Sequence, residues 1–178
     1  MGRRSQPRGR APRTWSTRDP GIRFWAAPDA QEARTTSDER VLIVDDESAI
    51  RLICRLNLGS SGFATLEAAD GDSALAMARA EQPDLILLDV MLPGKDGWQV
   101  AEELAMAAET REIPILFLSA RSDRRDESRG YELGGVGYIT KPFDPNFMTD
   151  RVGAVLERVR RGERDELRRE WRDRIRHD

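Results

Sequence analysis

The sequence has little cysteine, little histidine and no long apolar run, and each shortage excludes a class of protein. Its 178 residues include one cysteine, Cys54, and one histidine, His177. A lone cysteine excludes a disulfide framework, and the two residues together cannot complete a Cys/His zinc site. A Ser-His-Asp centre is excluded unless His177, the penultimate residue, supplies its base. No apolar run approaches the roughly 18 residues of a membrane-spanning helix, so we expect no integral membrane protein.

Charge is distributed unevenly along the chain, although the formal net charge is only -3. Residues 1–40 include nine basic and five acidic residues, whereas residues 41–160 include thirteen basic and twenty-one acidic ones. A basic front end is therefore followed by an acidic body. The acidic body argues against direct DNA binding, and we expect none.

Residues 1–39 are rich in arginine and proline and have no apolar periodicity, so we expect a disordered tail. Because Trp15, Phe24 and Trp25 lie among the arginines, contact with nucleic acid through charge and stacking is an alternative. A start of translation placed too far upstream is another explanation of this segment. Arg3-Arg4 lacks the following apolar stretch of a twin-arginine export signal, and we expect a cytoplasmic protein.

Residues 161–178 are charged almost throughout and are predicted to form a helical extension. Leu167, Trp171 and Ile175 recur at steps of four, which places them on one helical stripe. Two interpretations remain open: the helix packs back on its own domain, or it binds a partner or a second copy of the chain.

Short apolar runs alternate with amphipathic segments between residues 40 and 160. Strands are predicted at 41–44, 63–67, 85–88, 115–118 and 136–140. Helices are predicted at 48–58, 71–80, 98–106, 123–133 and 145–160. The alternation predicts an α/β domain with a parallel sheet and helices on both faces. On the first helix we expect Ile50, Ile53, Cys54 and Asn57 to share one face and Gly59 to supply the stop.

Polar side chains stand where four of these strands end. The first strand is followed by Asp45 and Asp46, the third by Asp89, the fourth by Ser119 and the fifth by Lys141. In an open parallel sheet these ends lie along one edge, where such folds bind their ligands. Each residue has a simpler explanation, since aspartate and serine often cap helices and lysine is usually a surface residue. Those explanations do not account for their coincidence at one edge.

The chemistry of this group indicates phosphoryl transfer. Neighbouring carboxylates resist joint ionisation unless a cation neutralises them, and an incomplete cage of oxygen ligands suits Mg²⁺. A lysine and a hydroxyl group supply further stabilisation for a phosphoryl group in transfer. A carboxylate is itself a possible nucleophile, and Asp89, followed by a Pro-Gly turn, is the natural candidate.

Four stretches of the sequence resemble the receiver domain of bacterial two-component response regulators. They are VLIVDDE (41–47), DLILLDVMLPGKDG (84–97), PILFLSA (114–120) and GYITKPF (137–143). The resemblance covers residues 40–160. It implies a doubly wound, flavodoxin-like sheet of five parallel strands in the order 2-1-3-4-5.

The resemblance also implies roles for the residues at the strand ends. Asp89 resembles the residue that accepts the phosphoryl group. Asp45 and Asp46 resemble the acid pair that positions Mg²⁺, for which Asp89 and the backbone carbonyl of Met91 are the further ligands.

A second group of residues resembles the machinery that responds to the phosphoryl group. Ser119 is similar to the switch hydroxyl, and Lys141 to the lysine that contacts the phosphoryl oxygens. Tyr138 resembles the aromatic residue that turns inward when the hydroxyl moves. The resemblance implies a cis peptide bond at Lys141-Pro142 and a responsive face made of the fourth helix, fifth strand and fifth helix.

Two departures from the family pattern have predicted consequences. Gly134-Gly135-Val136-Gly137 replaces a segment that commonly carries two acids, and we expect it to loosen the entry to the fifth strand. Met91 and Arg121 are bulky and cationic at positions that gate the hydrolytic water, which predicts a long-lived phosphate.

The leading functional hypothesis is a signalling module and not an enzyme acting on an external substrate. It takes a phosphoryl group from a histidine kinase or phosphotransfer protein and acts on a downstream protein. Because only 18 residues follow Arg160, we expect a stand-alone receiver. A homodimer through the responsive face or the C-terminal helix is a further expectation.

Two alternatives compete with this hypothesis. A Mg²⁺-dependent phosphohydrolase using Asp89 would commonly need a second aspartate two residues on, where this chain has Met91. A receiver-like scaffold that accepts no phosphate is disfavoured by the complete acidic set.

Overall fold

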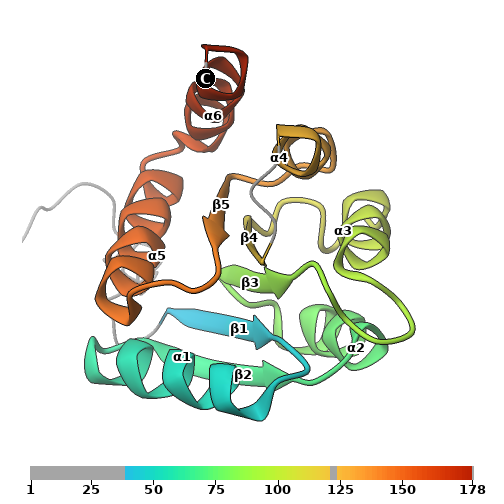
Figure 1. Ribbon diagram of the computed structural model, residues 1–178, viewed down its shortest axis with the longest axis vertical. Coiled ribbons are helices and arrows are strands. Elements are labelled where there is room, and N and C mark those ends of the chain that lie inside the picture. Colours follow the sequence, from blue (N-terminus) through green and yellow to red (C-terminus); the bar gives the residue numbers. More distant parts are fainter. Residues whose placement is uncertain (1–38, 121–123, 178) are drawn as a thin grey trace, which may run out of the picture. The chain divides into compact units, whose positions relative to one another are not determined.

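The computed structural model describes residues 39–120 and 124–177, so the predicted disordered tail lies outside the described residues apart from Glu39. In this part of the chain the strands are β1 (Arg40–Val44), β2 (Ala64–Ala68), β3 (Leu85–Asp89), β4 (Ile115–Ser119) and β5 (Gly137–Thr140). The helices are α1 (Ser48–Ser60), α2 (Gly71–Glu81), α3 (Gly97–Met106), α4 (Arg124–Glu132), α5 (Pro145–Arg160) and α6 (Arg164–His177). Strands alternate with helices, and one further helix follows α5 (Figure 1).

The five strands form one parallel sheet in the order β2-β1-β3-β4-β5. Figure 1 shows α1 and α5 against one face of this sheet, and α2 and α3 against the other. This arrangement confirms the predicted fold class, a doubly wound α/β fold with strand order 2-1-3-4-5. None of the described helices is long and apolar enough to cross a lipid bilayer.

The wholly apolar strands are explained by burial on both faces of the sheet. Val41 and Ile43 of β1 pack in the core under α1 and α5, whereas Leu42 and Val44 pack in the core under α2 and α3. Successive strand residues point to opposite faces, so a strand covered on both sides has no solvent-facing position. All four of these side chains are fully buried.

Helix α1 differs from its prediction at its end and on its face. It continues through Gly59 to Ser60, and Gly62 with φ of 91° makes the left-handed turn instead. The predicted face is confirmed in part, because Cys54 is fully buried and Ile50 is partly buried. Ile53 is instead 38% exposed, and Leu58, which was not included, is fully buried. Leu58 holds the last turn on the core, and its carbonyl accepts a hydrogen bond from Phe63 N at 3.1 Å.

Helix α6 lies where the charged extension was expected and packs on its own domain. It contacts α4, α5 and β5. Leu167 is 7% exposed and Trp171 only 1%, and Ile175 is partly buried. The first of the two interpretations of this segment is therefore the one that the structure shows.

Cys54 provides a test of this core. Burial raises the pKa of the Cys54 thiol to about 12. At pH 8 about one thiol in ten thousand is then ionised, compared with about a quarter for an ordinary cysteine of pKa near 8.5. We expect iodoacetamide to alkylate Cys54 very slowly in the folded protein and rapidly in denaturant, as measured by mass spectrometry. Equal rates in the two conditions would contradict the buried position.

Candidate functional site

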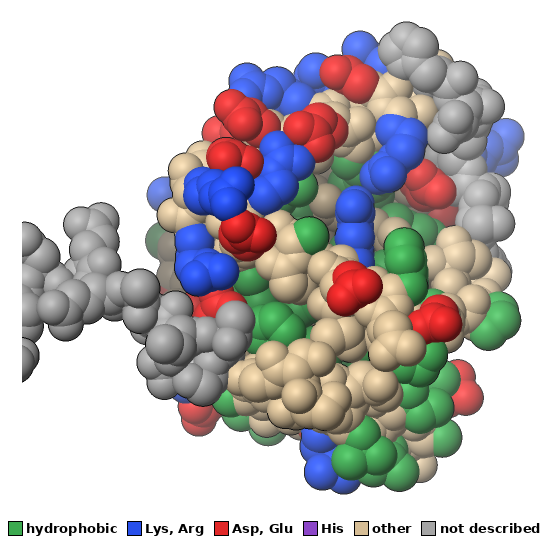
Figure 2. Space-filling view, turned by 90° about the vertical axis from the view of Figure 1, so that its left-hand side faces the viewer, with side chains coloured by type: hydrophobic (Ala, Val, Ile, Leu, Met, Phe, Trp, Pro, Cys, Tyr) green, Lys and Arg blue, Asp and Glu red, His purple; other side chains and the backbone are tan. Residues whose placement is uncertain are grey.

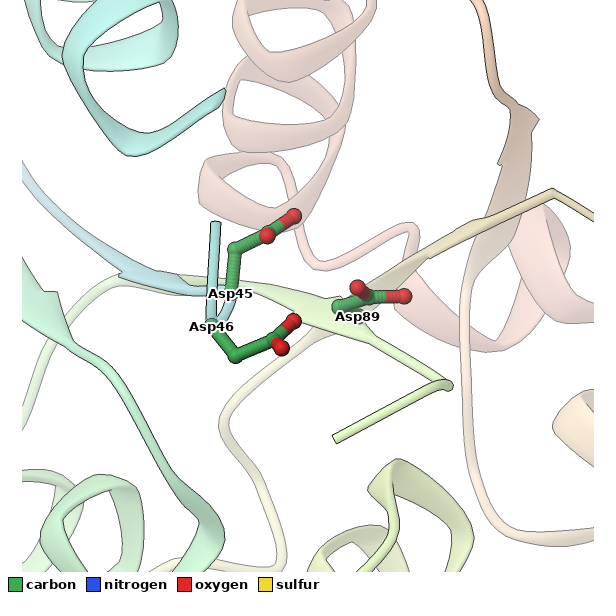
Figure 3. Close-up of side chains that lie close together, drawn as sticks. All are labelled: Asp45, Asp46 and Asp89. Carbon is green, nitrogen blue, oxygen red and sulfur yellow. The ribbon is translucent and has the colours of Figure 1, made fainter. Parts of the chain in front are cut away.

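The carboxyl ends of four strands bring the predicted site residues to one edge of the sheet. Asp45 follows β1, Asp89 is the last residue of β3, Ser119 is the last of β4, and Lys141 follows β5. Asp46 is adjacent to Asp45 in the β1–α1 loop. Figure 3 shows that the three aspartate side chains lie close together at these two strand ends.

The three aspartates form one carboxylate cluster. One carboxylate oxygen from each lies within 4.8 Å of the other two. Asp45 is fully buried and Asp89 is 3% exposed, whereas Asp46 is exposed. Helix capping does not explain them: the N-cap residue of α1 is Glu47, and its side chain makes no capping hydrogen bond. The cluster therefore has the geometry of a cation site rather than of a helix start.

Lys141 joins the two buried carboxylates of the cluster. Its Nζ donates to Asp45 Oδ2 at 2.6 Å and to Asp89 Oδ2 at 2.8 Å. The Lys141 side chain is 13% exposed, which excludes the explanation of an ordinary surface lysine. The ammonium compensates part of the negative charge that burial places at this edge.

The pKa shifts at the site follow from burial and from this pairing. Burial raises the pKa of Asp45 above its ordinary value, although the hydrogen bonds from Lys141 and from the Glu47 N–H oppose the shift. Burial would lower the pKa of Lys141, but its hydrogen bonds to Asp45 and Asp89 outweigh that effect and raise it. Lys141 therefore stays protonated at neutral pH, whereas burial disfavours the ionised form of the Asp45 carboxyl group.

The β3–α3 loop positions Asp89 through its backbone. The Met91 N–H donates to Asp89 Oδ1 at 3.0 Å, and the Met91 side chain is 52% exposed beside it. The loop turns at Gly94, with φ of 74°, and α3 begins with a capping box between Asp96 and Gln99. The proposed metal contact of the Met91 carbonyl stays a prediction.

Gly97 is a site residue that the sequence motifs contained but did not explain. A Cβ at Gly97 would lie 2.2 Å from the Asp89 carbonyl oxygen and 2.8 Å from Val90 Cα. Only glycine therefore lets the first turn of α3 approach the end of β3 this closely. In the sequence, Gly97 is marked only by its position directly after Lys95-Asp96. The close approach of α3 to β3 depends on the tertiary fold, which the sequence motif does not state.

Arg51 is a second residue that sequence reasoning missed. Its guanidinium donates to the backbone carbonyl of Asp45 at 2.7 Å and to that of Asp46 at 3.1 Å. Arg51 thus holds the backbone of the acid pair from the first turn of α1. A cation at a helix N-terminus is unfavourable because of the macrodipole. The presence of Arg51 in the first turn of α1 is therefore a sign that its side chain binds a group outside the helix.

The residues of the predicted response lie on β4, on β5 and after them. Ser119 is fully buried, and its carbonyl accepts a hydrogen bond from Lys141 N at 2.7 Å. Tyr138 is half-buried on β5, three residues before Lys141. The Lys141-Pro142 peptide bond is cis, as predicted. Arg121 lies outside the described residues.

The expectation that glycines loosen the entry to β5 stays a prediction, but the structure gives one of these glycines a packing role. A Cβ at Gly135 would lie 2.6 Å from the Phe117 ring and 3.0 Å from the indole of Trp171. Val136 is fully buried, and its N–H donates to the Ile115 carbonyl at 2.9 Å. The glycine here permits close packing between β4, β5 and α6.

Curated relatives of this chain are transcriptional regulators. The chain is 45% identical over 120 residues to the phosphate regulon transcriptional regulatory protein PhoB of Klebsiella pneumoniae, covering 67% of this chain and 52% of the relative. It is 43% identical over 121 residues to the alkaline phosphatase synthesis transcriptional regulatory protein PhoP of Bacillus subtilis, covering 68% and 50%. The chain thus spans about half the length of the curated relatives it matches.

Solved structures match the described domain closely. Chemotaxis protein CheY4 of Vibrio cholerae has a TM-score of 0.63 and 31% sequence identity, covering 66% of this chain and 98% of that one. A putative response regulator from Chloroflexus aurantiacus has a TM-score of 0.64 and 34% identity, covering 67% and 98%.

The expectation of no direct DNA binding is contradicted by these relatives. PhoB and PhoP are transcriptional regulators, and so is a Synechocystis protein that is 42% identical over 122 residues, the DNA-binding dual master transcriptional regulator RpaA. The error lay in the physical argument. The net charge of residues 41–160 describes the receiver alone and carries no information about DNA binding by the whole of such a protein.

A family model also matches most of this chain. The model described as the response regulator receiver domain matches residues 41–153. The matched range begins with β1 and includes all the residues of the carboxylate cluster as well as Ser119 and Lys141. It therefore covers most of the chain and the entire candidate site, and the chain belongs to the response regulator receiver family.

Proposed function

We propose that the protein is a phospho-accepting receiver, in which Asp89 takes a phosphoryl group from a histidine kinase or a phosphotransfer protein. The observation that carries this proposal is the position of Lys141 Nζ, hydrogen-bonded to both buried carboxylates, Asp45 and Asp89. An ammonium beside the nucleophile stabilises the charge of an incoming phosphoryl group. Added phosphate then changes the balance of charge at the ends of β3, β4 and β5.

We propose Mg²⁺ as the cofactor, held by Asp45, Asp46 and Asp89. The residues fit this ion because their carboxylate oxygens cluster within 4.8 Å and because burial disfavours an uncompensated negative charge on Asp45. When bound, the ion would neutralise the carboxylates and the oxygens of the phosphoryl group.

The proposed transfer step needs no reactant besides Asp89 and the phosphorylated histidine of the kinase. A carboxylate oxygen of Asp89 forms a bond to phosphorus while the bond between phosphorus and the kinase histidine nitrogen breaks. The electron pair of that bond stays on the imidazole. Lys141, already within hydrogen-bonding distance of Asp89, donates to the phosphoryl oxygens of the acyl phosphate that forms.

We also propose that the protein is not an enzyme acting on external substrates, and that it catalyses only its own phosphorylation and dephosphorylation. The exposed, apolar Met91 stands two residues after the nucleophile, where a hydrolase would commonly carry a second acid. The cytoplasmic location remains a prediction.

Replacement of the acceptor is the first test. Wild type incubated with Mg²⁺ and acetyl phosphate is expected to gain the mass of one phosphoryl group, and Asp89→Asn none. Asp72→Asn is the matched control, because Asp72 is an exposed aspartate whose ion pair is with Lys95 of the β3–α3 loop. Intact-protein mass spectrometry measures the gain.

Each contrary outcome bears on one alternative. Phosphate on Asp89→Asn would show that the acceptor is wrongly assigned. Steady hydrolysis of p-nitrophenyl phosphate by wild type would support the phosphohydrolase. No gain in wild type, with acetyl phosphate or with a histidine kinase, would favour the receiver-like scaffold.

Arg51 gives a test of the metal site. Arg51→Ala should weaken Mg²⁺ binding about tenfold, since residues that orient metal ligands contribute about 10- to 100-fold to affinity. Arg55→Ala is the control: both arginines pair with Glu67, but only Arg51 is hydrogen-bonded to the acid loop. Isothermal titration calorimetry distinguishes the two, and equal losses in both variants would contradict the role of Arg51.

Met91 gives a test of phosphate lifetime. Met91→Asn should shorten the lifetime of the phosphorylated protein severalfold, because the amide admits water and hydrogen-bonds it beside Asp89. Met106→Asn, which changes an exposed methionine at the end of α3, should leave it unchanged. The lifetime is followed as loss of the phosphorylated mass, and unchanged decay in Met91→Asn would count against the gating role.

A further inference from the structure

Helix α6 covers the side of the domain where α4, β5 and α5 meet. It contacts the second half of α4 at Gly130 and Tyr131, and the second half of α5 at Arg158. It also contacts β5, which is the edge strand of the sheet. We call this surface, formed by α4, β5 and α5, the docking surface.

The apolar stripe of α6 reaches both cores of the domain. Leu167 belongs to the core under α1 and α5, and Trp171 to the core under α2 and α3. The Trp171 ring meets the Tyr131 ring edge-on, with centroids 6.2 Å apart. One amphipathic helix of the same chain thus packs against the edge strand β5 as well as against both cores.

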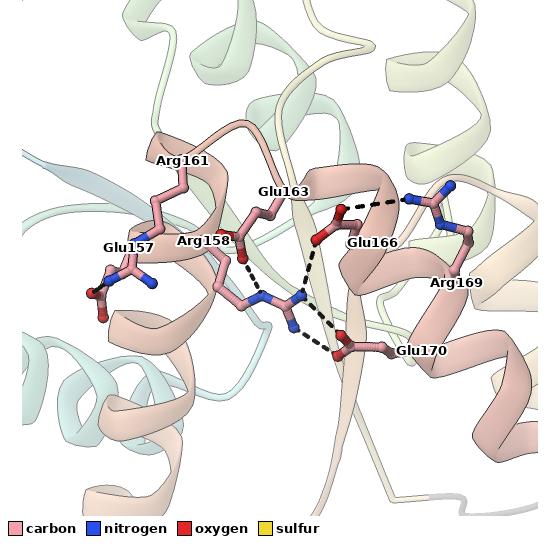
Figure 4. Close-up of polar contacts among 7 residues, drawn as sticks. All are labelled: Glu157, Arg158, Arg161, Glu163, Glu166, Arg169 and Glu170. Carbon is pink, nitrogen blue, oxygen red and sulfur yellow. Dashed lines mark hydrogen bonds and ion pairs between the residues drawn. The ribbon is translucent and has the colours of Figure 1, made fainter.

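Ion pairs fasten α6 to the end of α5. The guanidinium of Arg158 donates to both carboxylate oxygens of Glu170, at 2.6 and 2.9 Å, and to Glu163 at 2.9 Å (Figure 4). Glu166 lies 3.9 Å from the same guanidinium. Basic and acidic side chains alternate over the upper part of the side that Figure 2 shows. Such exposed pairs set register and orientation more than they add stability.

Two further arginines fasten α6 to other elements. Arg168 donates to the Tyr131 carbonyl at 2.9 Å and lies over the Tyr131 ring. Arg164 pairs with Glu112 at 3.0 Å and donates to the Arg111 carbonyl at 3.0 Å, in the segment before β4. The contacts of α6 therefore span three parts of the domain and specify one position for it.

The packing of α6 on the domain nevertheless leaves a hydrogen-bonding group of α6 without a partner among the described residues. The buried indole nitrogen of Trp171 finds no hydrogen-bond acceptor among the described residues. A cavity of about 240 Å³ lies between α5 and α6, and one of about 180 Å³ between α4 and α6. Burial lowers the pKa of Arg151 in the first cavity, and the like charges of Arg174 and Arg158 lower it further. A buried donor without a partner lowers the stability of the docked position and therefore favours release.

Trp171 is also connected to the phosphorylation site by one strand. A Cβ at Gly130 would lie 3.0 Å from the Trp171 indole and 3.1 Å from the Phe117 ring, so the two rings flank the same glycine. Phe117 stands on β4 two residues before Ser119, whose carbonyl is hydrogen-bonded to Lys141. A displacement of β4 or β5 at the phosphorylation site therefore shifts Phe117 and the surface against which the Trp171 ring packs.

We propose that α6 is a cis-acting latch: it covers a helix-binding surface in the unphosphorylated protein and is released when Asp89 is phosphorylated. The inference rests on the proposed function. The occupant that the surface fits is an amphipathic helix with leucine and tryptophan four residues apart and an acid between them, as in Leu167, Glu170 and Trp171 of α6. A partner helix of that chemistry competes with α6 for the docking surface.

Amide hydrogen exchange of residues 164–177 in the full chain tests the release. Phosphorylation should speed exchange of α6 about tenfold, within the usual range of allosteric coupling, while β1 and β3 remain protected. Mass spectrometry of the same samples shows whether phosphate was added. Phosphorylated protein with unchanged α6 protection would overturn the latch, whereas absence of phosphate would count against the proposed function alone.

Two variants test the latch without phosphate. Trp171→Ala should speed exchange of α6 about 100-fold or more, since truncating a buried tryptophan removes most of its packing. Trp171→Phe, which keeps a ring and removes the unpaired donor, should keep most of the protection. Glu170→Arg is a surface change that leaves the core intact and should loosen α6 by repulsion from Arg158. Loosening of β1 and β3 together with α6 in Trp171→Ala and Glu170→Arg would show that α6 is part of the fold and not a latch.

A peptide of residues 163–178 tests the surface itself. A fluorescent form should bind full-length Trp171→Ala at least tenfold more tightly than wild type, because the covalently attached helix no longer fills the surface. The same peptide carrying L167S and W171S should bind neither protein. Fluorescence anisotropy measures binding, and equal affinity of the unchanged peptide for wild type and Trp171→Ala would overturn the proposal.

Discussion

The site depends on one ammonium group held between two buried carboxylates. Lys141 reaches from the end of β5 across to β3 and β1, so a single side chain spans the edge at which the carboxyl ends meet. Removing one partner of a buried ion pair costs about 3–5 kcal/mol, because the charge that remains has no compensation. This free-energy cost opposes separation of Lys141 from the two carboxylates, so the site stays assembled before a phosphoryl group arrives. Preorganised charge of this kind needs little rearrangement when the reaction begins.

Much of the fold and of the site was predictable because each feature depends on local sequence. A short wholly apolar run such as 41–44 fits a strand covered on both faces, and the structure buries all of it. The polar residue at the end of each such strand must then lie at the carboxyl edge of the sheet, so the sequence alone predicts that Asp45, Asp89 and Lys141 meet there. Topology alone was sufficient to bring them together.

The features that were missed depend on distances between elements. Nothing in the sequence around Gly97 or Arg51 states how near the end of β3 or the acid loop will come. The stripe of Leu167 and Trp171 predicted an apolar face but not which surface covers it. Gly135 was interpreted as a source of freedom, whereas its missing side chain makes room for two aromatic rings. Charge counts failed in another way, because they described one domain and were applied to a whole protein.

The short connection between α5 and α6 sets a threshold for any competitor of α6. Only residues 161–163 separate the two helices, and Gly162 makes the turn with φ of 76°. A segment on so short a tether acts at an effective concentration of about millimolar or higher, far above that of most proteins in a cell. While α6 is docked, a weak ligand is therefore excluded from this surface by simple competition. Selectivity on this side of the molecule comes from the length of a loop as much as from the shape of a surface.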